Sequence, residues 1–236
     1  MFALSVFAQK QIDTSQPTVL SPEQAAKEGK ALADEILGQK PAQNTTNAGV
    51  MTIRTPAMRA QIPIQFEVFN TETNWCSRYN ASNMTVVVLH DGARVNQYRL
   101  SKPDGKVRDF SGNQAIKTPF AGSDFSMGDL GLEFFHWPEQ RLTKKEMKRS
   151  RSCKVLESTN PEPIAGTYSR VVSWIDNESD GIVMAQAYDA QGKLLKEFIP
   201  KKIKKVEGQW QLEEMEIDNV QANSSTRVDF DLSGPK

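Results

Sequence analysis

The side chains that most often perform catalysis or bind metals are sparse in this 236-residue chain and do not form groups. Neither of the two histidines, His90 and His136, stands beside a second type of metal ligand at a spacing that suits zinc. The chain has no Gly-x-Ser-x-Gly elbow, no glycine-rich phosphate loop and no cysteine with a histidine partner nearby in sequence. Asp229 and Asp231 share one face of a predicted strand, which is an ordinary pattern for exposed surface. We therefore expect no enzymatic activity, no cofactor and no metal.

Charge excludes one further class of function. Lysine plus arginine and aspartate plus glutamate each number 29, which gives a formal net charge of zero, and no nucleic-acid binding is expected. One segment is nevertheless strongly basic, with only Glu146 as a counter-charge. Its cations are Arg141, Lys144, Lys145, Lys148, Arg149, Arg151 and Lys154. Such a run is typical of a solvated face; the alternative is a contact for anionic lipid headgroups or an acidic partner.

The two cysteines, Cys76 and Cys153, leave two interpretations open. In an exported protein they could form one disulfide, and otherwise they are two small buried apolar residues.

The N-terminus predicts export. Residues 1–8 form a short apolar run that ends in Val6-x-Ala8, a pattern that signal peptidase accepts, so we interpret them as the remnant of a signal peptide. A greasy terminus without that role is the alternative. Residues 9–48 are expected to hold a polar leader, a helix and a linker from residue 39 to residue 48, and residues 49–236 to form a single domain.

A helix is predicted from Pro22 to Leu37. Ser21 is a good N-cap, Pro22 suits the first helical position, and Gln24 stands where it completes a capping box. Gly38 ends the helix. Its apolar face consists of Ala25, Ala26, Gly29, Leu32, Ile36 and Leu37, and it requires an apolar surface to cover.

From Met51 onward the pattern is that of strands joined by hairpins. Ile62, Ile64, Phe66 and Val68 alternate with polar residues, and turn signals such as Asp91-Gly92 separate the apolar segments. Short hairpin connections predict an antiparallel sheet. In the last part of the chain, a change of parity between Leu212 and Met215 predicts a bulge at Glu213-Glu214.

The segment from Phe120 to Leu130 joins the two groups of strands. Gly122 permits a turn with positive φ, Ser126 is an N-cap, and Asp129 is placed for a capping box. A second short helix is therefore predicted from Met127 to Phe135.

This segment also resembles a known family. The string Gly-Ser-Asp-Phe-Ser-x-x-Asp-Leu is similar to the hallmark of the LolA-like outer-membrane lipoprotein-sorting proteins, and further similarity extends to Leu232. The motif residues are Gly122, Ser123, Asp124, Phe125, Asp129 and Leu130. The resemblance implies a mainly β (α+β) fold, in which a curved antiparallel sheet forms an unclosed β-barrel with a helical lid from Pro22 to Leu37 and Met127 to Phe135. It also implies a periplasmic carrier with no catalytic activity.

Large, adaptable apolar side chains on the predicted strands fit that implication. Methionine and aromatic groups can repack around acyl chains of different shape. The candidate cavity-lining residues are Phe66, Val88, Phe134, Trp174, Met184, Tyr188, Phe198, Trp210, Met215 and Phe230. The alternative is an envelope interaction module with the same fold and a filled core.

The expected partners are a lipid or a lipidated protein, with only peripheral or transient membrane contact. The resemblance alone adds an envelope transporter or an outer-membrane acceptor. We expect a monomer.

Overall fold

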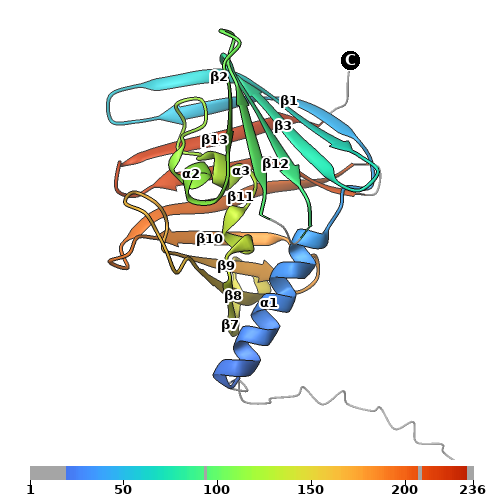
Figure 1. The fold of residues 1–236 in the computed structure, drawn as a ribbon, viewed down its shortest axis with the longest axis vertical. Helices are drawn as coiled ribbons and strands as arrows, with labels where there is room; N and C mark the ends of the chain where they lie inside the picture. Colours follow the sequence, from blue (N-terminus) through green and yellow to red (C-terminus); the bar gives the residue numbers. More distant parts are fainter. Residues whose placement is uncertain (1–19, 93–94, 207–208, 233–236) are drawn as a thin grey trace, which may run out of the picture.

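A computed structural model describes residues 20–92, 95–206 and 209–232 (Figure 1). The expected signal-peptide remnant, residues 1–8, lies outside these ranges. The helices are α1 (Pro22–Gly38), α2 (Gly112–Lys117), α3 (Met127–Leu130) and the 3₁₀ helix η1 (Glu133–His136). The strands are β1 (Thr45–Arg54), β2 (Arg59–Asn70), β3 (Trp75–Ala81), β4 (Met84–His90), β5 (Gln97–Ser101), β6 (Val107–Phe110), β7 (Glu139–Lys148), β8 (Arg151–Thr159), β9 (Arg170–Asp176), β10 (Ile182–Tyr188), β11 (Leu194–Val206), β12 (Gln209–Asn219) and β13 (Ser224–Asp231).

All of these strands belong to one antiparallel sheet, in the order β6-β5-β4-β3-β2-β1-β13-β12-β11-β10-β9-β8-β7. Strands that follow one another in sequence are neighbours in the sheet, except for β6 and β7. At the centre of the sheet β1 pairs with β13, and Met51 lies opposite Val228. The two edges are β6 and β7, so the sheet does not close. The strongly curved, unclosed antiparallel sheet predicted from the sequence is confirmed.

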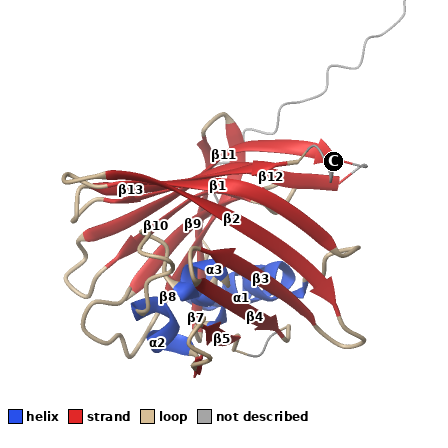
Figure 2. Ribbon diagram, turned by 90° about the horizontal axis from the view of Figure 1, so that it is seen from above, coloured by secondary structure: helices blue, strands red, loops and turns tan. Residues whose placement is uncertain are grey.

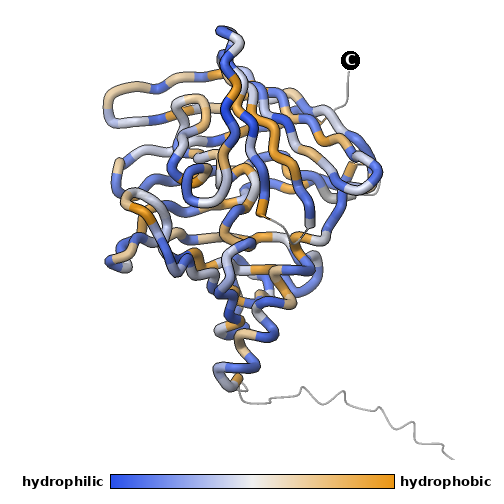
Figure 3. The backbone as a smooth tube through the Cα atoms, viewed as in Figure 1, coloured by the Kyte–Doolittle hydropathy of each residue, from blue (hydrophilic) through white to orange (hydrophobic). Residues whose placement is uncertain are grey.

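The sheet arches over the helices, which lie on its concave side (Figure 2). Hydrophobic and hydrophilic residues alternate along many strands (Figure 3), which is the pattern of a sheet with one face toward the core. The segment from residue 111 to residue 138 runs from one sheet edge to the other and contributes much of the core beneath the arch. Its fully or nearly fully buried side chains include Phe120, Phe125, Met127, Phe134 and Phe135.

Helix α1 covers the other end of the concave side, where it packs on β7 and touches η1. The predicted start is confirmed: Ser21 and Gln24 form the capping box, and Pro22 occupies the first turn. The buried face contains Ala25, Gly29, Leu32 and Ala33, whereas Ala26, which was assigned to the apolar face, is exposed. None of the helices among the described residues is long and apolar enough to cross a membrane.

The second predicted helix needs correction, because residues 127–135 do not form one continuous helix. The capping box of Ser126 and Asp129 is present and α3 begins at Met127 as predicted, but α3 ends at Leu130. Leu132 has a left-handed backbone with φ of 51°, and η1 follows it. A Cβ atom at Gly131 would collide with the Tyr98 hydroxyl group, so the close approach of the Tyr98 side chain explains the glycine.

The linker also needs correction. We expected residues 39–48 to be irregular, but β1 begins at Thr45 and pairs with Val68 of β2. The polar Asn-Thr sequence here gives no apolar pattern that predicts a strand. Hydrogen-bonded pairing with β2, and not burial of apolar side chains, holds this part of β1 in place. Its exposed and half-buried residues alternate from Thr45 to Val50.

Bends in the sheet come from irregular pairing. The predicted bulge at Glu213-Glu214 is confirmed: Leu212 lies opposite Ile203 and Glu214 opposite Lys202, which leaves Glu213 without a position in the ladder.

The disulfide is corrected, because Cys76 and Cys153 are both free and buried. They stand on β3 and β8, which seven other strands separate in the sheet order. The structure therefore supports the second interpretation, in which Cys76 and Cys153 are small buried apolar residues.

Packing of α1 gives a testable expectation. A Cβ atom at Gly29 would lie 2.6 Å from the Arg141 backbone of β7, whereas one at Gly38 would meet nothing within 4 Å. Gly29→Ala is expected to push α1 off the sheet and lower the free energy of unfolding by about 2 kcal/mol. Gly38→Ala should change it by less than about 0.5 kcal/mol. Urea titration of both variants measures this, and equal stability of the two would contradict the packing described.

Candidate ligand-binding hollow

A hollow of about 730 Å³ lies beneath the arch, between the sheet and the helical cover. We call it the inner hollow. Its apolar wall consists of Ile36 of α1, Leu132 and Phe134 of the segment that links the edges, and side chains of β10, β11 and β12. These strand residues are Ile182, Ala185, Phe198, Pro200, Ile203, Leu212 and Met215. Its volume is within the range of roughly 300–1,000 Å³ that small-molecule sites occupy.

A second hollow, of about 410 Å³, continues toward β1 and β2. It shares Leu212 and Met215 with the inner hollow, and its aromatic side chains are Phe66, Trp75, Tyr79 and Phe230. The rings of Phe66 and Tyr79 lie 4.9 Å apart between centroids, and those of Phe66 and Phe230 lie 5.8 Å apart. Together the two hollows form an elongated, mainly apolar space along the concave face.

The inner hollow is polar at the end formed by the β9–β10 turn. Arg151, Asp176, Ser179 and Asp180 border it there. Arg151 donates a hydrogen bond to Asp176 over 2.8 Å, and Lys154 forms an ion pair with Asp180 over 3.4 Å. A ligand with an apolar body and a polar end would match both parts of this wall.

Half of the ten side chains that the sequence proposed as cavity lining border these hollows. They are Phe66, Phe134, Phe198, Met215 and Phe230. They come from β2, η1, β11, β12 and β13, and the curvature of the sheet brings them to one side.

The structure places four other candidates away from these hollows, and one lies outside the description. Val88 is fully buried in the packed core. Trp174 and Met184 pack in a separate cluster with Cys153, and Tyr188 stacks on the Arg170 guanidinium, so these three do not line the hollow. The bulge between Ile182 and Met184 reverses the parity of β10, and no sequence signal marks that change. The side chain of Trp210 lies outside the described residues.

The motif residues anchor the linking segment to the sheet. Gly122 has φ of 72°, as its turn requires, and the Ser123 hydroxyl group donates to the Phe120 carbonyl oxygen over 2.7 Å. The Asp124 carboxylate accepts hydrogen bonds from the hydroxyl groups of Ser224 and Thr226, at 2.5 and 2.8 Å. Phe125 is buried, and the Leu130 carbonyl oxygen accepts a hydrogen bond from Tyr79.

Asp129 is the most deeply embedded charge of the motif. Its carboxylate accepts from the Ser126 N–H over 2.7 Å and from the Tyr168 hydroxyl group over 2.9 Å, and Lys196 lies 3.4 Å away. The Lys196 ammonium group also donates to the Asp124 carbonyl oxygen over 2.6 Å. Burial and the adjacent Asp129 charge raise the pKa of Tyr168 well above its ordinary value, so this phenol remains a donor. The network fixes α3 against β11.

A second buried acid, Glu133, lies at the start of η1. It accepts a hydrogen bond from the Tyr98 hydroxyl group over 2.8 Å, and Asn96 donates to the neighbouring Gly131 carbonyl oxygen over 2.7 Å. Burial raises the pKa of Glu133 to about 7, although the Tyr98 hydrogen bond opposes the shift. The carboxyl group therefore holds its proton in the native state under mildly acidic conditions.

The polar networks around Asp129 and Glu133 hold structural segments together. Among the described residues, no three histidine, cysteine, aspartate or glutamate side chains are grouped to hold a metal ion. The sequence missed Arg151, Asp176 and Pro200 as wall residues. A proline inside a predicted strand was the available signal, because proline ends a hydrogen-bonded ladder on one side.

Comparison with known proteins agrees with this architecture. A family model described as "uncharacterized protein"-like matches residues 84–232, which is more than half of the chain. The chain belongs to this family. No curated protein sequence matches it.

Solved structures identify the fold as LolA-like. A DUF1329 family protein from Desulfovibrio piger has a TM-score of 0.72 at 20% identity, covering 90% of this chain and 95% of its own. A domain described as outer-membrane lipoprotein-sorting, from Vibrio parahaemolyticus, has a TM-score of 0.73 at 18% identity. The match covers 89% of this chain and 95% of that domain. A LolA superfamily protein from Nitrosomonas europaea has a TM-score of 0.59 at 17% identity. The match covers 88% of this chain and 91% of that protein. The predicted resemblance to LolA-like proteins is confirmed for the fold.

Removing the hydroxyl group of Tyr168 tests the network around Asp129. Tyr168→Phe takes one donor from a buried carboxylate and is expected to lower the free energy of unfolding by about 2 kcal/mol. Tyr188→Phe is the matched control, since its half-buried hydroxyl group contacts only Gln186 among the described partners, and it should cost about 0.5 kcal/mol. Chemical denaturation measures both; a control as costly as Tyr168→Phe would argue against a special role of the network.

The raised pKa of Glu133 predicts how stability depends on pH. The native state keeps this proton up to about pH 7, while the unfolded chain releases it near its ordinary pKa of 4.5, so the native state binds more protons between these values. Stability therefore falls as pH rises through this window, by about 3 kcal/mol from this group. Glu133→Gln should remove that part of the fall. Denaturant midpoints at pH 4.5, 6 and 8 measure it, and parallel curves for both proteins would refute the assignment.

Proposed function

We propose that this protein is a non-catalytic carrier that holds the acyl chains of a lipid or a lipidated protein in the hollow beneath its arched sheet. The observation that carries the proposal is the apolar space of about 730 Å³ between the strands and the helical cover. A sheet of this curvature leaves an apolar concave face, and the helices cover only part of it. Hydrocarbon is the guest that such a wall favours, since each sequestered methylene contributes about 0.8 kcal/mol.

The lining favours a flexible apolar guest over a rigid one. Met215 stands where the two hollows meet, and Leu132, Phe134 and Phe198 border the inner one. Methionine and leucine side chains adapt to chains of different length, and most of the polar lining groups lie at the end formed by the β9–β10 turn. The hollow would then discriminate little between guests that differ only in the length or shape of their hydrocarbon chains.

The cellular setting belongs to the same proposal. The apolar N-terminal run that resembles a signal remnant supports export to the periplasm, and the neighbouring structures described as lipoprotein-sorting proteins support work between two membranes. A carrier must receive its guest from one membrane protein and deliver it to another. We infer an envelope transporter as donor or an outer-membrane acceptor, with α1 as the cover that moves because Ile36 at its end borders the hollow.

An envelope interaction module with a filled core is the other function that this fold could serve. The hollows favour the carrier, because a protein that used only its outer surface would gain stability from filling such space.

Filling the hollow tests the carrier function. Met215→Trp places a larger side chain where the two hollows meet, while Met184→Trp makes the same change in the separate cluster. Excluding about two methylene groups of a guest, at about 0.8 kcal/mol each, should weaken binding of the fluorescent fatty acid cis-parinaric acid roughly tenfold in Met215→Trp. Met184→Trp should bind as the unchanged protein does.

Fluorescence titration at equal protein concentrations gives the two dissociation constants, and far-ultraviolet circular dichroism confirms that both variants fold. Absence of fatty-acid binding by the unchanged protein would refute the carrier function. Equal weakening by both substitutions would place the guest outside the hollow.

A further inference from the structure

The sheet has an opening between two of its inner strands. Strands β10 and β11 pair from Tyr188 opposite Leu194 to Ala185 opposite Phe198, and there the pairing stops. Beyond this point β11 continues to Val206 on β12 alone, with a register shift at Pro200. Proline has no N–H to donate to a neighbour, so the strands separate where Pro200 stands.

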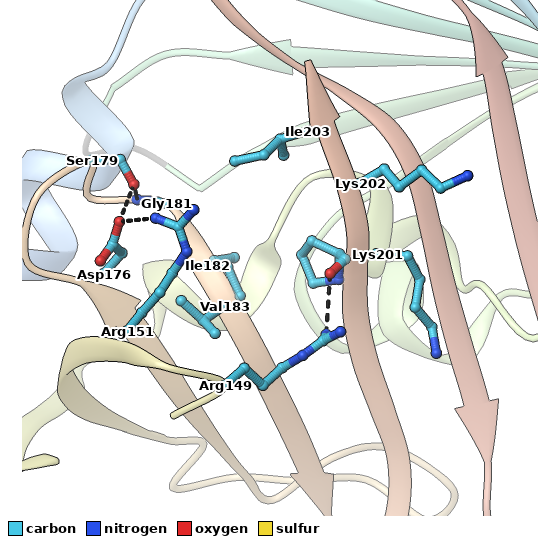
Figure 4. A pocket seen from close by; sticks show the side chains of 11 residues that line it. Arg149, Arg151, Asp176, Ser179, Gly181, Ile182, Val183, Lys201, Lys202 and Ile203 are labelled. Atoms are coloured by element: carbon cyan, nitrogen blue, oxygen red, sulfur yellow. Dashed lines mark hydrogen bonds and ion pairs between the residues drawn. The ribbon is translucent and has the colours of Figure 1, made fainter. Parts of the chain in front are cut away.

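A depression of about 250 Å³ occupies this opening. Ile182, Pro200 and Ile203 border both the depression and the inner hollow, so the opening lies next to the apolar space. Its rim differs from the rest of the hollow because cations surround it. These are Arg149, Arg151, Lys201 and Lys202 (Figure 4).

Arg149 supplies the least compensated of these charges. It stands at the tip of the β7–β8 hairpin and reaches across the opening, where its guanidinium group donates to the Pro200 carbonyl oxygen over 3.1 Å (Figure 4). Among the described residues, no carboxylate forms an ion pair with it. Both residues of the turn, Arg149 and Ser150, have left-handed backbones, with φ of 48° and 64°. A hairpin turn of this kind favours asparagine and glycine, so an arginine here is held at a cost in stability.

Arg151 provides a second guanidinium group on the same rim. It is held in place by the buried Asp176 carboxylate, which also accepts a hydrogen bond from Ser179, and its own side chain remains 44% exposed. The two lysines contribute less, because Glu216 pairs with Lys201 and Glu214 with Lys202. Two arginines against one aspartate therefore leave the opening positive. Of the nearby acids, Glu178 and Asp180 border the inner hollow but not the depression.

We propose that this opening binds the phosphate group of an anionic phospholipid whose acyl chains occupy the inner hollow, an inference that rests on the proposed carrier function. Guanidinium groups bind phosphate through paired, charge-assisted hydrogen bonds, and they are more weakly hydrated than ammonium groups. Arg149 and Arg151 both border the depression from one hairpin, so the rim offers two guanidinium groups to a phosphate group bound there. The separated strands let the headgroup remain at the surface while the tails extend inward.

Monomeric short-chain lipids test this inference by isothermal titration calorimetry on the full chain. Dihexanoyl phosphatidylglycerol carries the phosphate, dihexanoylglycerol has the same chains without it, and inorganic phosphate is the headgroup alone. We expect the phospholipid to bind about tenfold more tightly than the diacylglycerol, with the difference shrinking in 0.5 M salt because exposed charges are screened. Inorganic phosphate alone should give no binding at millimolar concentration.

Substitutions assign the effect to the opening. Arg149→Gln should weaken phospholipid binding about 3- to 10-fold and leave diacylglycerol binding unchanged, while Arg149→Lys should restore part of the loss. Lys27→Gln removes the same charge from the exposed face of α1 and should change neither affinity. Equal binding of both lipids, or equal effects of Arg149→Gln and Lys27→Gln, would overturn the headgroup site and leave the carrier intact. Binding of neither lipid would overturn both, and tight binding of inorganic phosphate would assign the opening to a free anion.

Discussion

The architecture depends on one constraint: an antiparallel sheet that curves strongly without closing has an apolar concave face that must be covered. Strand pairing of β1 with β13 joins the two halves of the chain at the centre of the sheet, and this leaves β6 and β7 as distant edges. The segment between them has to cross the concave side, and its buried aromatic side chains cover a large part of it. What this segment and α1 leave uncovered is the apolar hollow, so the hollow follows from the topology.

Polar contacts decide where the cover lies. Asp124 is tied to β13 through Ser224 and Thr226, Asp129 is tied to Tyr168, and Lys196 of β11 contacts both parts of the motif. Buried carboxylates with several donors are strongly position-specific, because displacement would leave a desolvated charge without partners. The motif therefore holds α3 against the sheet on the side where the hollow lies.

The sequence correctly predicted the features that depend on neighbouring residues, such as helix caps, strand alternation and bulges. The cap at Ser126, the regular alternation around Phe66 and the parity change before Met215 each led to the correct element. The basic strand β7 and the polar part of β1 were missed, because pairing with neighbours holds them and their side chains give no apolar period. Trp174 and Met184 lie in the cluster with Cys153 instead of at the hollow. For Met184 of β10, the bulge after Ile182 shifts the register without a residue that marks it. Pro200 inside a predicted strand was the one sequence signal for the opening, while the extent of the strand separation follows from the three-dimensional pairing.

The central claim is that hydrocarbon from a lipid guest fills the space that the protein's own side chains leave beneath the arch. The most direct measurement is mass spectrometry of the lipid extracted from the full chain, expressed with export to a bacterial envelope and purified without detergent, with lipid quantified per mole of protein. The account predicts an acyl lipid that copurifies at close to one molecule per chain. Protein that emerges free of lipid, and that acquires none when incubated with envelope lipid, would contradict it.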